Sequence, residues 1–168
     1  LQVAPKLHAE TDNEVAQAIC QEARTTFGSD YGVLWRIHDG SVELVHVEPP
    51  TEPLESGQTY GLDDFPGLQE AVRILRVSFI PDVLREARGQ GLEFVQQLGI
   101  RSSLRMPIVI GASTELVLVV SWQTVIADPD PSTLAILRRF ADQAGLALEQ
   151  LDRRRAEAEA ARRAAETL

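Results

Sequence analysis

Cysteine and lysine are almost absent from this chain of 168 residues. Cys20 is the single cysteine, which excludes an internal disulfide and any metal site built from several thiolates, and is compatible with a reducing cytoplasm. Lys6 is the single lysine, and it lies in an N-terminal stretch that we expect to be poorly ordered. Chemistry that depends on paired thiols or on a lysine Schiff base is therefore not expected.

Long apolar runs and an excess of positive charge are also missing. No apolar stretch reaches the roughly 18 residues that a membrane-spanning helix needs, so we expect no membrane insertion. The formal net charge of −9 disfavours DNA and RNA as direct partners, because an acidic surface repels a polyanion. The composition, with 44% hydrophobic residues, is that of one globular domain, which we place in the cytoplasm. A start at Leu1 without a signal-like region indicates a fragment of a larger protein.

Patterns that would support catalysis are scarce. Asp63 and Asp64 are neighbours in an acidic loop, whereas a general acid and base need facing geometry and unequal environments. Ser102 and Ser103 have no histidine or lysine at the spacing of a nucleophile motif. The segment Gly89–Gly91 lacks the third glycine and the Lys-Ser/Thr pair of a phosphate-binding loop. We therefore expect a protein that is not an enzyme.

The chain does contain an alternation of helical and strand-like segments. Asp39-Gly40 tolerates the positive φ of a tight turn, so we expect a strand on each side of it. The segment Thr51–Pro66 is rich in proline, glycine and acids, and we expect a mobile loop that adds nothing to the core. The other predicted helices and strands are helices at Asn13–Phe27, Gly67–Leu75 and Gly91–Leu98, a strand within residues 77–83, and a hairpin of Leu104–Ile110 and Leu116–Trp122. The last of these strands is β-branched and suited to a central position, buried on both faces.

A long C-terminal helix carries a heptad pattern. Its apolar residues recur at alternating spacings of three and four, at Leu134, Leu137, Ala141, Ala144, Leu148 and Leu151. A second face with Ile136, Phe140 and Ala147 is expected to pack on the sheet, which leaves the heptad face for a partner helix. We predict a homodimer whose interface contains Leu137, Ala141, Ala144, Leu148 and Leu151. Beyond Leu151 the leucines stop, and we interpret residues 152–168 as a helical linker.

The order of these segments resembles the GAF domain family over about Val15 to Leu151. The most specific parts are GIRSSLRMP, with Gly99, Ser102 and Pro107, and the closing helix FADQAGLAL. The resemblance implies an α+β, GAF/PAS-like fold: a central antiparallel sheet with N- and C-terminal helices on one face and a loop-covered ligand cavity on the other. It also implies a small-molecule sensor of a bacterial signal-transduction protein, commonly dimeric, that passes a ligand-dependent change to a covalently attached output domain.

Members of the family with known ligands provide a comparison for individual residues. Cyclic-nucleotide-binding members carry an Asn-Lys signature, which is absent here because Asn13 is the only asparagine and Lys6 precedes it. Bilin-binding members attach the chromophore to a cysteine near the cavity, whereas Cys20 is expected to be a buried thiol of the first helix. Methionine-sulfoxide-reducing members need several cysteines, which excludes that enzyme.

Haem-binding members use a histidine, and the chain has three. His46 is in phase with Val42 and Leu44 on its strand, so it is the histidine expected to face the interior. The competing interpretation is an ordinary hydrogen-bonded imidazole on a strand. The sequence therefore identifies neither a cofactor nor a ligand.

Apolar residues of the strands and of one short helix are expected to line the cavity, with ordinary core packing as the competing interpretation. Small-ligand cavities are mostly apolar with a few polar groups, which Arg101, Ser102 and Arg105 are near enough to provide. The predicted ligand-binding set is Trp35, Phe79, Phe94, Arg101, Ser102, Leu104, Met106 and Trp122.

The sequence thus predicts three parts: an N-terminal extension (residues 1–12), a GAF-like sensor domain (13–151) and a helical linker (152–168) to an output domain outside this chain. The competing functional hypothesis is a ligand-free dimerisation or protein-interaction scaffold, in which the protein's own side chains fill the cavity.

Overall fold

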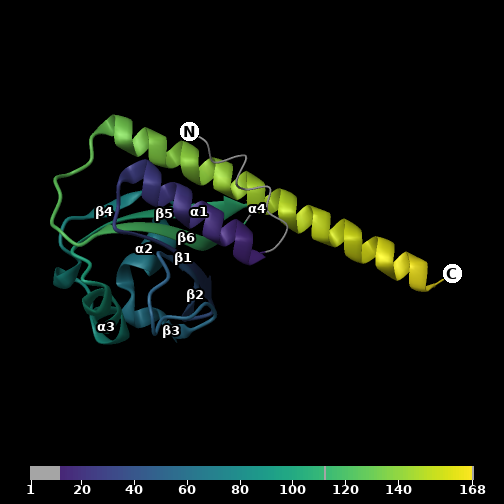
Figure 1. Cartoon of the computed structure of the whole chain (residues 1–168), viewed down its shortest axis with the longest axis horizontal. Helices are drawn as coiled ribbons and strands as arrows, with labels where there is room; N and C mark the ends of the chain where they lie inside the picture. Colours follow the sequence, from purple (N-terminus) through teal and green to yellow (C-terminus); the bar gives the residue numbers. More distant parts are fainter. Residues whose placement is uncertain (1–11, 112, 168) are drawn as a thin grey trace.

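The computed structural model describes residues 12–111 and 113–167, so the expected N-terminal extension lies outside the described residues except for Asp12. The described chain forms a six-stranded sheet in which every neighbouring pair is antiparallel (Figure 1). The strands are β1 (Tyr31–His38), β2 (Ser41–Glu48), β3 (Thr59–Gly61), β4 (Ser78–Ile80), β5 (Ser102–Ile110) and β6 (Ser113–Trp122). Their order across the sheet is β3-β2-β1-β6-β5-β4. The expected α+β fold class is confirmed.

Both predicted hairpins are present. Asp39 and Gly40 join β1 to β2 with φ angles of 37° and 87°, as a tight turn requires. Strand β6 lies between β1 and β5, and its residues 116–121 are all buried. The prediction of a central strand covered on both faces is therefore confirmed.

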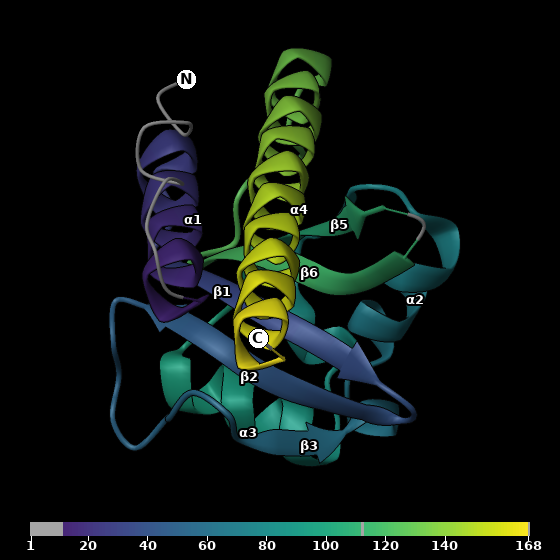
Figure 2. The same cartoon turned by 90° about the vertical axis from the view of Figure 1, so that its right-hand side faces the viewer.

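The terminal helices α1 (Asp12–Phe27) and α4 (Pro131–Glu166) lie side by side on one face of the sheet (Figures 1 and 2). The start of α4 is fixed by Asp130, whose Oδ1 accepts a hydrogen bond from the Thr133 amide at 2.8 Å. Gly145 allows α4 to approach β5 closely, because a Cβ at this position would meet the carbonyl oxygen of Val109. The two ends of the described chain thus seal the same face.

Short elements cover the opposite face. They are the 3₁₀ turns η2 (Leu62–Asp64) and η3 (Val83–Arg85) and the helices α2 (Pro66–Ile74) and α3 (Gly89–Leu98). The predicted helices at Gly67–Leu75 and Gly91–Leu98 are confirmed, with bounds that differ by at most two residues.

The predicted loop at Thr51–Pro66 is partly wrong. It contains β3 and η2, and its Phe65 is only 8% exposed, packed with Tyr60 in the apolar core on this face. Proline and glycine predicted the turns of this segment correctly, but two aromatic side chains separated by turn residues are enough to anchor it to the sheet.

Two apolar cores lie on the two sides of the sheet, because successive side chains of a strand point to opposite faces. The core under the terminal helices contains Leu104, Met106 and Leu118. The other core contains Trp35, Val117 and Val119. None of the helices in the described part combines the length and apolar character that crossing a membrane requires.

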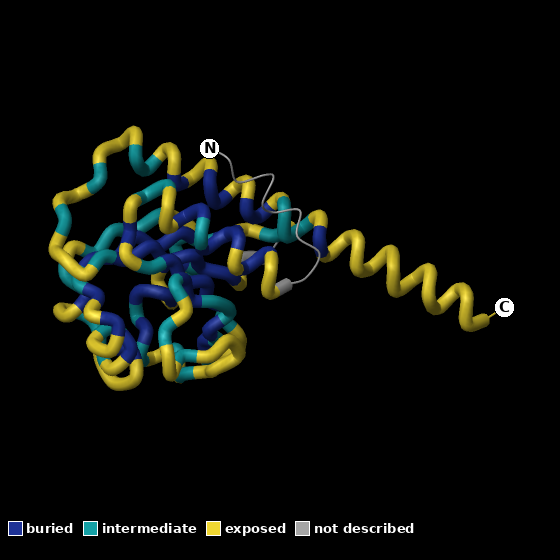
Figure 3. The backbone as a smooth tube through the Cα atoms, in the orientation of Figure 1, coloured by how far each residue is buried: buried dark blue, intermediate teal, exposed yellow. Residues whose placement is uncertain are grey.

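Helix α4 continues well beyond the sheet (Figure 1). Leu151 is its last buried residue, and residues 152–167 are all exposed (Figure 3, yellow). The α4 segment from residue 152 to residue 167 therefore has no buried side chain, and its surface carries ion pairs such as Arg162 to Glu159 at 2.9 Å.

Candidate functional site

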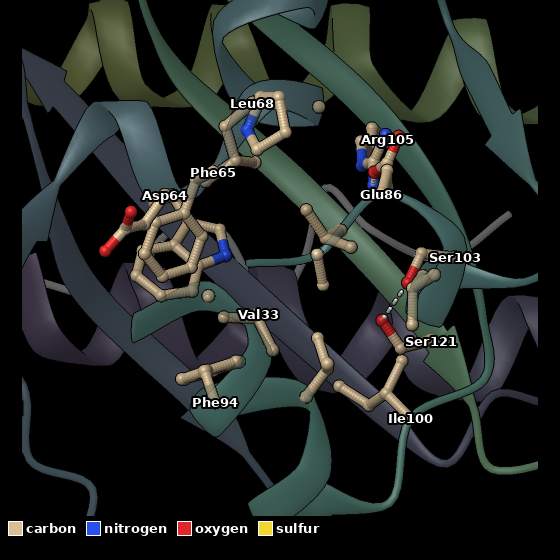
Figure 4. A pocket seen from close by; sticks show the side chains of 18 residues that line it. Val33, Asp64, Phe65, Leu68, Glu86, Phe94, Ile100, Ser103, Arg105 and Ser121 are labelled. Atoms are coloured by element: carbon tan, nitrogen blue, oxygen red, sulfur yellow. Dashed lines mark hydrogen bonds and ion pairs between the residues drawn. The ribbon is translucent and has the colours of Figure 1, made fainter. Parts of the chain in front are cut away.

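A cavity of about 60 Å³ lies between the sheet and the short elements that cover its second face (Figure 4). Strand residues of β1, β5 and β6 form its floor, and α2, η3, α3 and their connections form its walls. A volume of this size holds a few water molecules, each of which needs about 10–15 Å³. In this state the cavity is small and mostly apolar.

Alternate residues of three adjacent strands provide the floor. Ser103 and Arg105 come from β5, and Val119 and Ser121 come from β6. Ser103 and Ser121 are cross-strand partners, and their hydroxyl oxygens are 2.9 Å apart, so one hydroxyl donates to the other. These positions share one face because each is two residues from the next along its strand.

Aromatic rings form one wall of the cavity. The ring of Trp35 lies 5.1 Å from that of Phe65 and 4.9 Å from that of Phe94, measured between centroids. Tyr60 does not line the cavity but adds a fourth ring to this cluster at 6.0 Å from Trp35, and partial burial raises the pKa of its hydroxyl. Four rings from four separate segments therefore meet here, in the tilted and edge-on geometry that aromatic pairs prefer.

The polar end of the cavity contains a partly buried ion pair. The Arg105 guanidinium contacts the Glu86 carboxylate, and their side chains are 9% and 29% exposed. Figure 4 shows this pair on the opposite side of the cavity from Phe65, with the bonded hydroxyls of Ser103 and Ser121 nearby. The cavity thus has an apolar aromatic side and a polar side that contains one cation, its carboxylate partner and two hydroxyls.

Asp64 also lines the cavity, but its carboxylate is already engaged. Its Oδ2 accepts a hydrogen bond from the Gln90 amide at 2.9 Å, in the first turn of α3. The main-chain oxygen of its neighbour Asp63 accepts a hydrogen bond from Arg88 Nε at 2.9 Å. These two acidic residues therefore fix the start of α3 to the η2 segment, which is a structural role.

Only part of the predicted ligand-binding set lines this cavity. Trp35 and Phe94 do so, as does Arg105, which the sequence suggested as a polar group. The predicted apolar residues Phe79, Leu104, Met106 and Trp122 instead belong to the core under α1 and α4. Leu104 and Trp122 border a separate surface groove beside the start of α4.

The predicted polar residues Arg101 and Ser102 have other roles. Arg101 Nη2 donates to Asp82 Oδ2 at 3.1 Å, and this hydrogen bond is the main cause that lowers the pKa of Asp82. Ser102 Oγ donates to the Pro81 carbonyl at 2.8 Å and accepts from the Ile126 amide at 3.0 Å. Both residues tie β5 to neighbouring loops and do not line the cavity.

The polar floor of the cavity has a recognisable signal in the sequence. In SSLRMPIV, polar Ser103 and Arg105 alternate with apolar Leu104, Met106 and Ile108. Strict alternation predicts that the two groups lie on opposite faces of the sheet. The apolar group packs under the long helix, which leaves Ser103 and Arg105 for the cavity. The same alternation would have identified Ser103, which the predicted set lacks.

The residues of the predicted dimer interface point toward the protein's own sheet. Four of its five residues, Leu137, Ala141, Ala144 and Leu151, are at most 8% exposed and pack in the core under the helices. Leu148 is partly buried against the same core. Side chains that are buried in a single chain have little surface left for a second chain, so the heptad face of α4 is its sheet-packing face.

His46 does not reach the cavity. A β-bulge on β2 shifts the register, so that Leu34 pairs with His46 while Trp35 pairs with Leu44. The bulge places His46 on the helical face, where its Nε2 lies 2.8 Å from Glu48 Oε2. Within the described residues, no group of three or more histidine, cysteine, aspartate or glutamate side chains is arranged to hold a metal ion.

Cys20 is fully buried on α1, in the core under the terminal helices. Burial raises the pKa of its thiol, and the nearby Glu48 carboxylate raises it further. The sheet separates this thiol from the cavity, as expected for a structural cysteine.

An antiparallel sheet with both terminal helices on one face and a small apolar cavity on the other defines a class of α+β modules. The chain belongs to the GAF domain family, whose model matches residues 13–148. A comparison with curated proteins finds no match.

Solved structures share the fold at low sequence identity. Residues 122 to 287 of a methyl-accepting chemotaxis protein superpose with a TM-score of 0.70 at 16% identity, over 90% of this chain and 97% of that one. The GAF domain of a two-component sensor histidine kinase from Bacillus halodurans gives 0.69 at 17%, over 86% and 97%. The phycoerythrobilin-bound GAF domain of a cyanobacterial phytochrome gives 0.68 at 18%, over 91% and 96%.

Proposed function

We propose that this GAF domain is a regulatory sensor of a small molecule in a bacterial signal-transduction protein, that it acts in the cytoplasm, and that it is not itself a catalyst. The observation that carries the proposal is the cavity, which combines an aromatic wall with a buried cation and two hydroxyls. Ligand sites have this composition, mostly apolar with a few oriented polar groups. Sensory proteins among its structural relatives are consistent with the same role.

Transmission of the signal is proposed to use α4. This helix packs on the sheet up to Leu151 and continues as an exposed helix to Glu166. A ligand that binds one arrangement of the cavity walls more tightly shifts the population toward that arrangement. The sheet is shared between the cavity and α4, so a change in its geometry alters the direction of the projecting segment and reaches an attached output domain.

Dimerisation through the terminal helices is also part of the proposal, with a different surface from the heptad face. Leu146 is 55% exposed on the outer surface of α4, and Ile136, 41% exposed, borders the groove that Phe27 and Trp122 also line. We propose that a second copy of this chain covers Leu146, which removes its apolar side chain from water.

A thermal-shift screen of small metabolites tests the sensor function. A ligand present at a hundredfold excess over its Kd stabilises the folded state by about 2.7 kcal/mol. For a domain of this size that raises Tm by about 5–10 °C. The cavity-filling variant Val119→Phe is expected to lose this shift, because Val119 lies on the cavity floor.

Val109→Phe is the matched control, since Val109 is 51% exposed and is not one of the cavity-lining residues. It is expected to keep the ligand-induced shift in full. If a metabolite raises the Tm of Val119→Phe by as much as that of the wild-type chain, it binds outside the cavity. This result would contradict the proposal.

One observation favours a second function, a ligand-free interaction scaffold. The rings of Trp35, Phe65 and Phe94 already occupy much of the space under α2 and α3 and leave a cavity of about 60 Å³. If no metabolite in the screen shifts Tm and the projecting helix still pairs, the scaffold function replaces the sensor function.

A further inference from the structure

Arg105 is a charged group in a site that is otherwise mostly apolar. Its side chain is 9% exposed, and the guanidinium occupies the place that a Cβ of residue 67 would need, so the glycine at the start of α2 makes room for it. A buried cation is stable only when it is paired. Glu86 provides that pairing in the present structure.

Glu86 is the more exposed partner of the pair. It follows the short turn η3, and its side chain is 29% exposed, against 9% for Arg105. The segment is anchored at Val83, whose amide donates to the Arg101 carbonyl at 2.7 Å and whose side chain is 2% exposed. The carboxylate can therefore turn into water while the segment keeps its attachment to the sheet.

The fully buried polar groups of the protein are already engaged. Across residues 12–111 and 113–167, no buried side-chain nitrogen or oxygen lacks a hydrogen-bond partner. A polar ligand at this end of the cavity therefore gains most by taking over a partner that the protein already uses. Among the groups at the polar end, Arg105 gains most from such an exchange, because a guanidinium holds a carboxylate through two parallel hydrogen bonds.

We propose that the ligand is a small organic carboxylate whose head group replaces Glu86 on Arg105 and whose apolar body packs against Trp35, Phe65 and Phe94. This inference rests on the proposed sensor function and names its ligand class. The hydroxyls of Ser103 and Ser121, now bonded to each other, lie near the pair and can turn to donate to a ligand oxygen. Glu86 acts as an internal competitor that occupies the site when the ligand is absent.

Charge excludes the two other ligand types from this exchange. A cationic ligand would place its charge beside the Arg105 guanidinium. A neutral ligand that displaced Glu86 would leave a buried cation unpaired, which is strongly unfavourable. Only an anion restores the pairing of Arg105 after Glu86 has left.

Replacement of Glu86 by a ligand on Arg105 also gives the cavity wall two states. Glu86 leads directly into α3 through Arg88, which holds the main chain of Asp63 through a hydrogen bond of 2.9 Å. With Glu86 on Arg105, this wall is attached to the sheet. With a ligand on Arg105, the Glu86 contact is lost while the Val83 and η2 contacts remain, so the wall around Glu86 can adjust its position.

Isothermal titration calorimetry with matched acid and amide pairs tests the inference on the 168-residue chain. The probes are benzoate with benzamide and cyclohexanecarboxylate with its amide. At least one acid is expected to bind about tenfold or more tightly than its amide, because the amide cannot pair with the guanidinium. Glu86→Gln is expected to tighten binding of that acid about tenfold, because it removes the competitor.

Two further variants complete the test. Glu93→Gln makes the same charge change at an exposed position of α3 outside the cavity lining and is expected to leave both affinities unchanged. The double variant Glu86→Gln with Arg105→Gln keeps the pair neutral and is expected to fold and to bind acid and amide equally.

The possible results separate this inference from the proposed function. Amides that bind as tightly as acids, in a manner blocked by Val119→Phe, overturn the carboxylate inference and keep the sensor function. An affinity for acids that Glu86→Gln leaves unchanged also overturns the carboxylate inference and keeps the sensor function. If none of the four probes binds the wild-type chain or Glu86→Gln, the carboxylate inference is wrong, and the metabolite screen decides the sensor function separately.

Discussion

The face toward which a single residue of β5 points decides its chemistry. Arg101 and Arg105 are four residues apart on the same stretch of chain, yet Arg101 pairs with Asp82 outside the cavity and Arg105 with Glu86 inside it. Ser102 and Ser103 differ in the same way, since Ser102 bonds to loops and Ser103 to Ser121. The two serines have different roles because adjacent residues of the strand point into different cores, whereas the two arginines differ because Arg101 precedes β5 and Arg105 lies within it.

Cys20 provides a direct prediction at this scale. The thiol is fully buried, and burial raises its pKa well above the ordinary value, so at pH 8 it stays protonated and out of reach of thiol reagents. We expect labelling by Ellman's reagent to be about a hundredfold or more slower in the native chain than in guanidinium chloride, where the protein is unfolded. Absorbance at 412 nm measures it, and one thiol per chain sets the endpoint. Native labelling as fast as that of free glutathione would contradict the burial of this residue.

At the scale of an element, the apolar residues of α4 fall into a buried group and an exposed group. The heptad face, with Leu137, Ala144 and Leu151, packs on the sheet. Leu146 is exposed on the outer surface, and Ile136 is exposed at the groove beside Phe27 and Trp122. A period of three and four residues is shared by a coiled-coil seam and by a helix that packs on a sheet, so the pattern alone does not distinguish the two.

Substitutions in the buried and the exposed group of α4 residues are expected to lower the free energy of unfolding by different amounts. Leu137→Ala removes a side chain with no exposed surface and is expected to lower the free energy of unfolding by about 2–5 kcal/mol. Ile136→Ala, one residue earlier and 41% exposed, is expected to cost less than about 1 kcal/mol, because alanine also favours the helix. Urea denaturation followed by circular dichroism measures both. Equal losses would contradict the orientation of α4.

The elements themselves were largely predictable from the sequence, whereas details of the cavity were not. Caps, turns and apolar periods are local signals, so the helices and hairpins were identified with small errors at their ends. The bulge that turns His46 away from the cavity depends on pairing with β1 and has no local signal. Phe65 was missed because a single aromatic residue within a turn-rich segment gives no periodic pattern, although it joins the wall through tertiary contacts.

For the whole molecule, the arrangement of the helices limits how two chains can pair. Pairing is expected to use the outer surface of α4 with α1, since the heptad face is covered by the sheet. Substitutions at Leu148 and Leu151 would therefore damage the core and would not report on pairing alone. An informative substitution must change an exposed side chain and leave the fold intact.

Leu146→Arg meets this requirement, because Leu146 is 55% exposed on α4. We expect the wild-type chain to sediment as a dimer and Leu146→Arg to sediment as a monomer of about 18.5 kDa, with Kd raised about tenfold or more, because the substitution places a charge in an apolar contact. Leu75→Arg is the matched control, since Leu75 is 56% exposed at the end of α2, on the opposite side of the sheet. Sedimentation velocity across a range of concentrations distinguishes the three chains. If Leu146→Arg and Leu75→Arg both behave as the wild-type chain does, the outer surface of α4 is not the contact between copies, and α4 then transmits any change in the sheet from within a single chain.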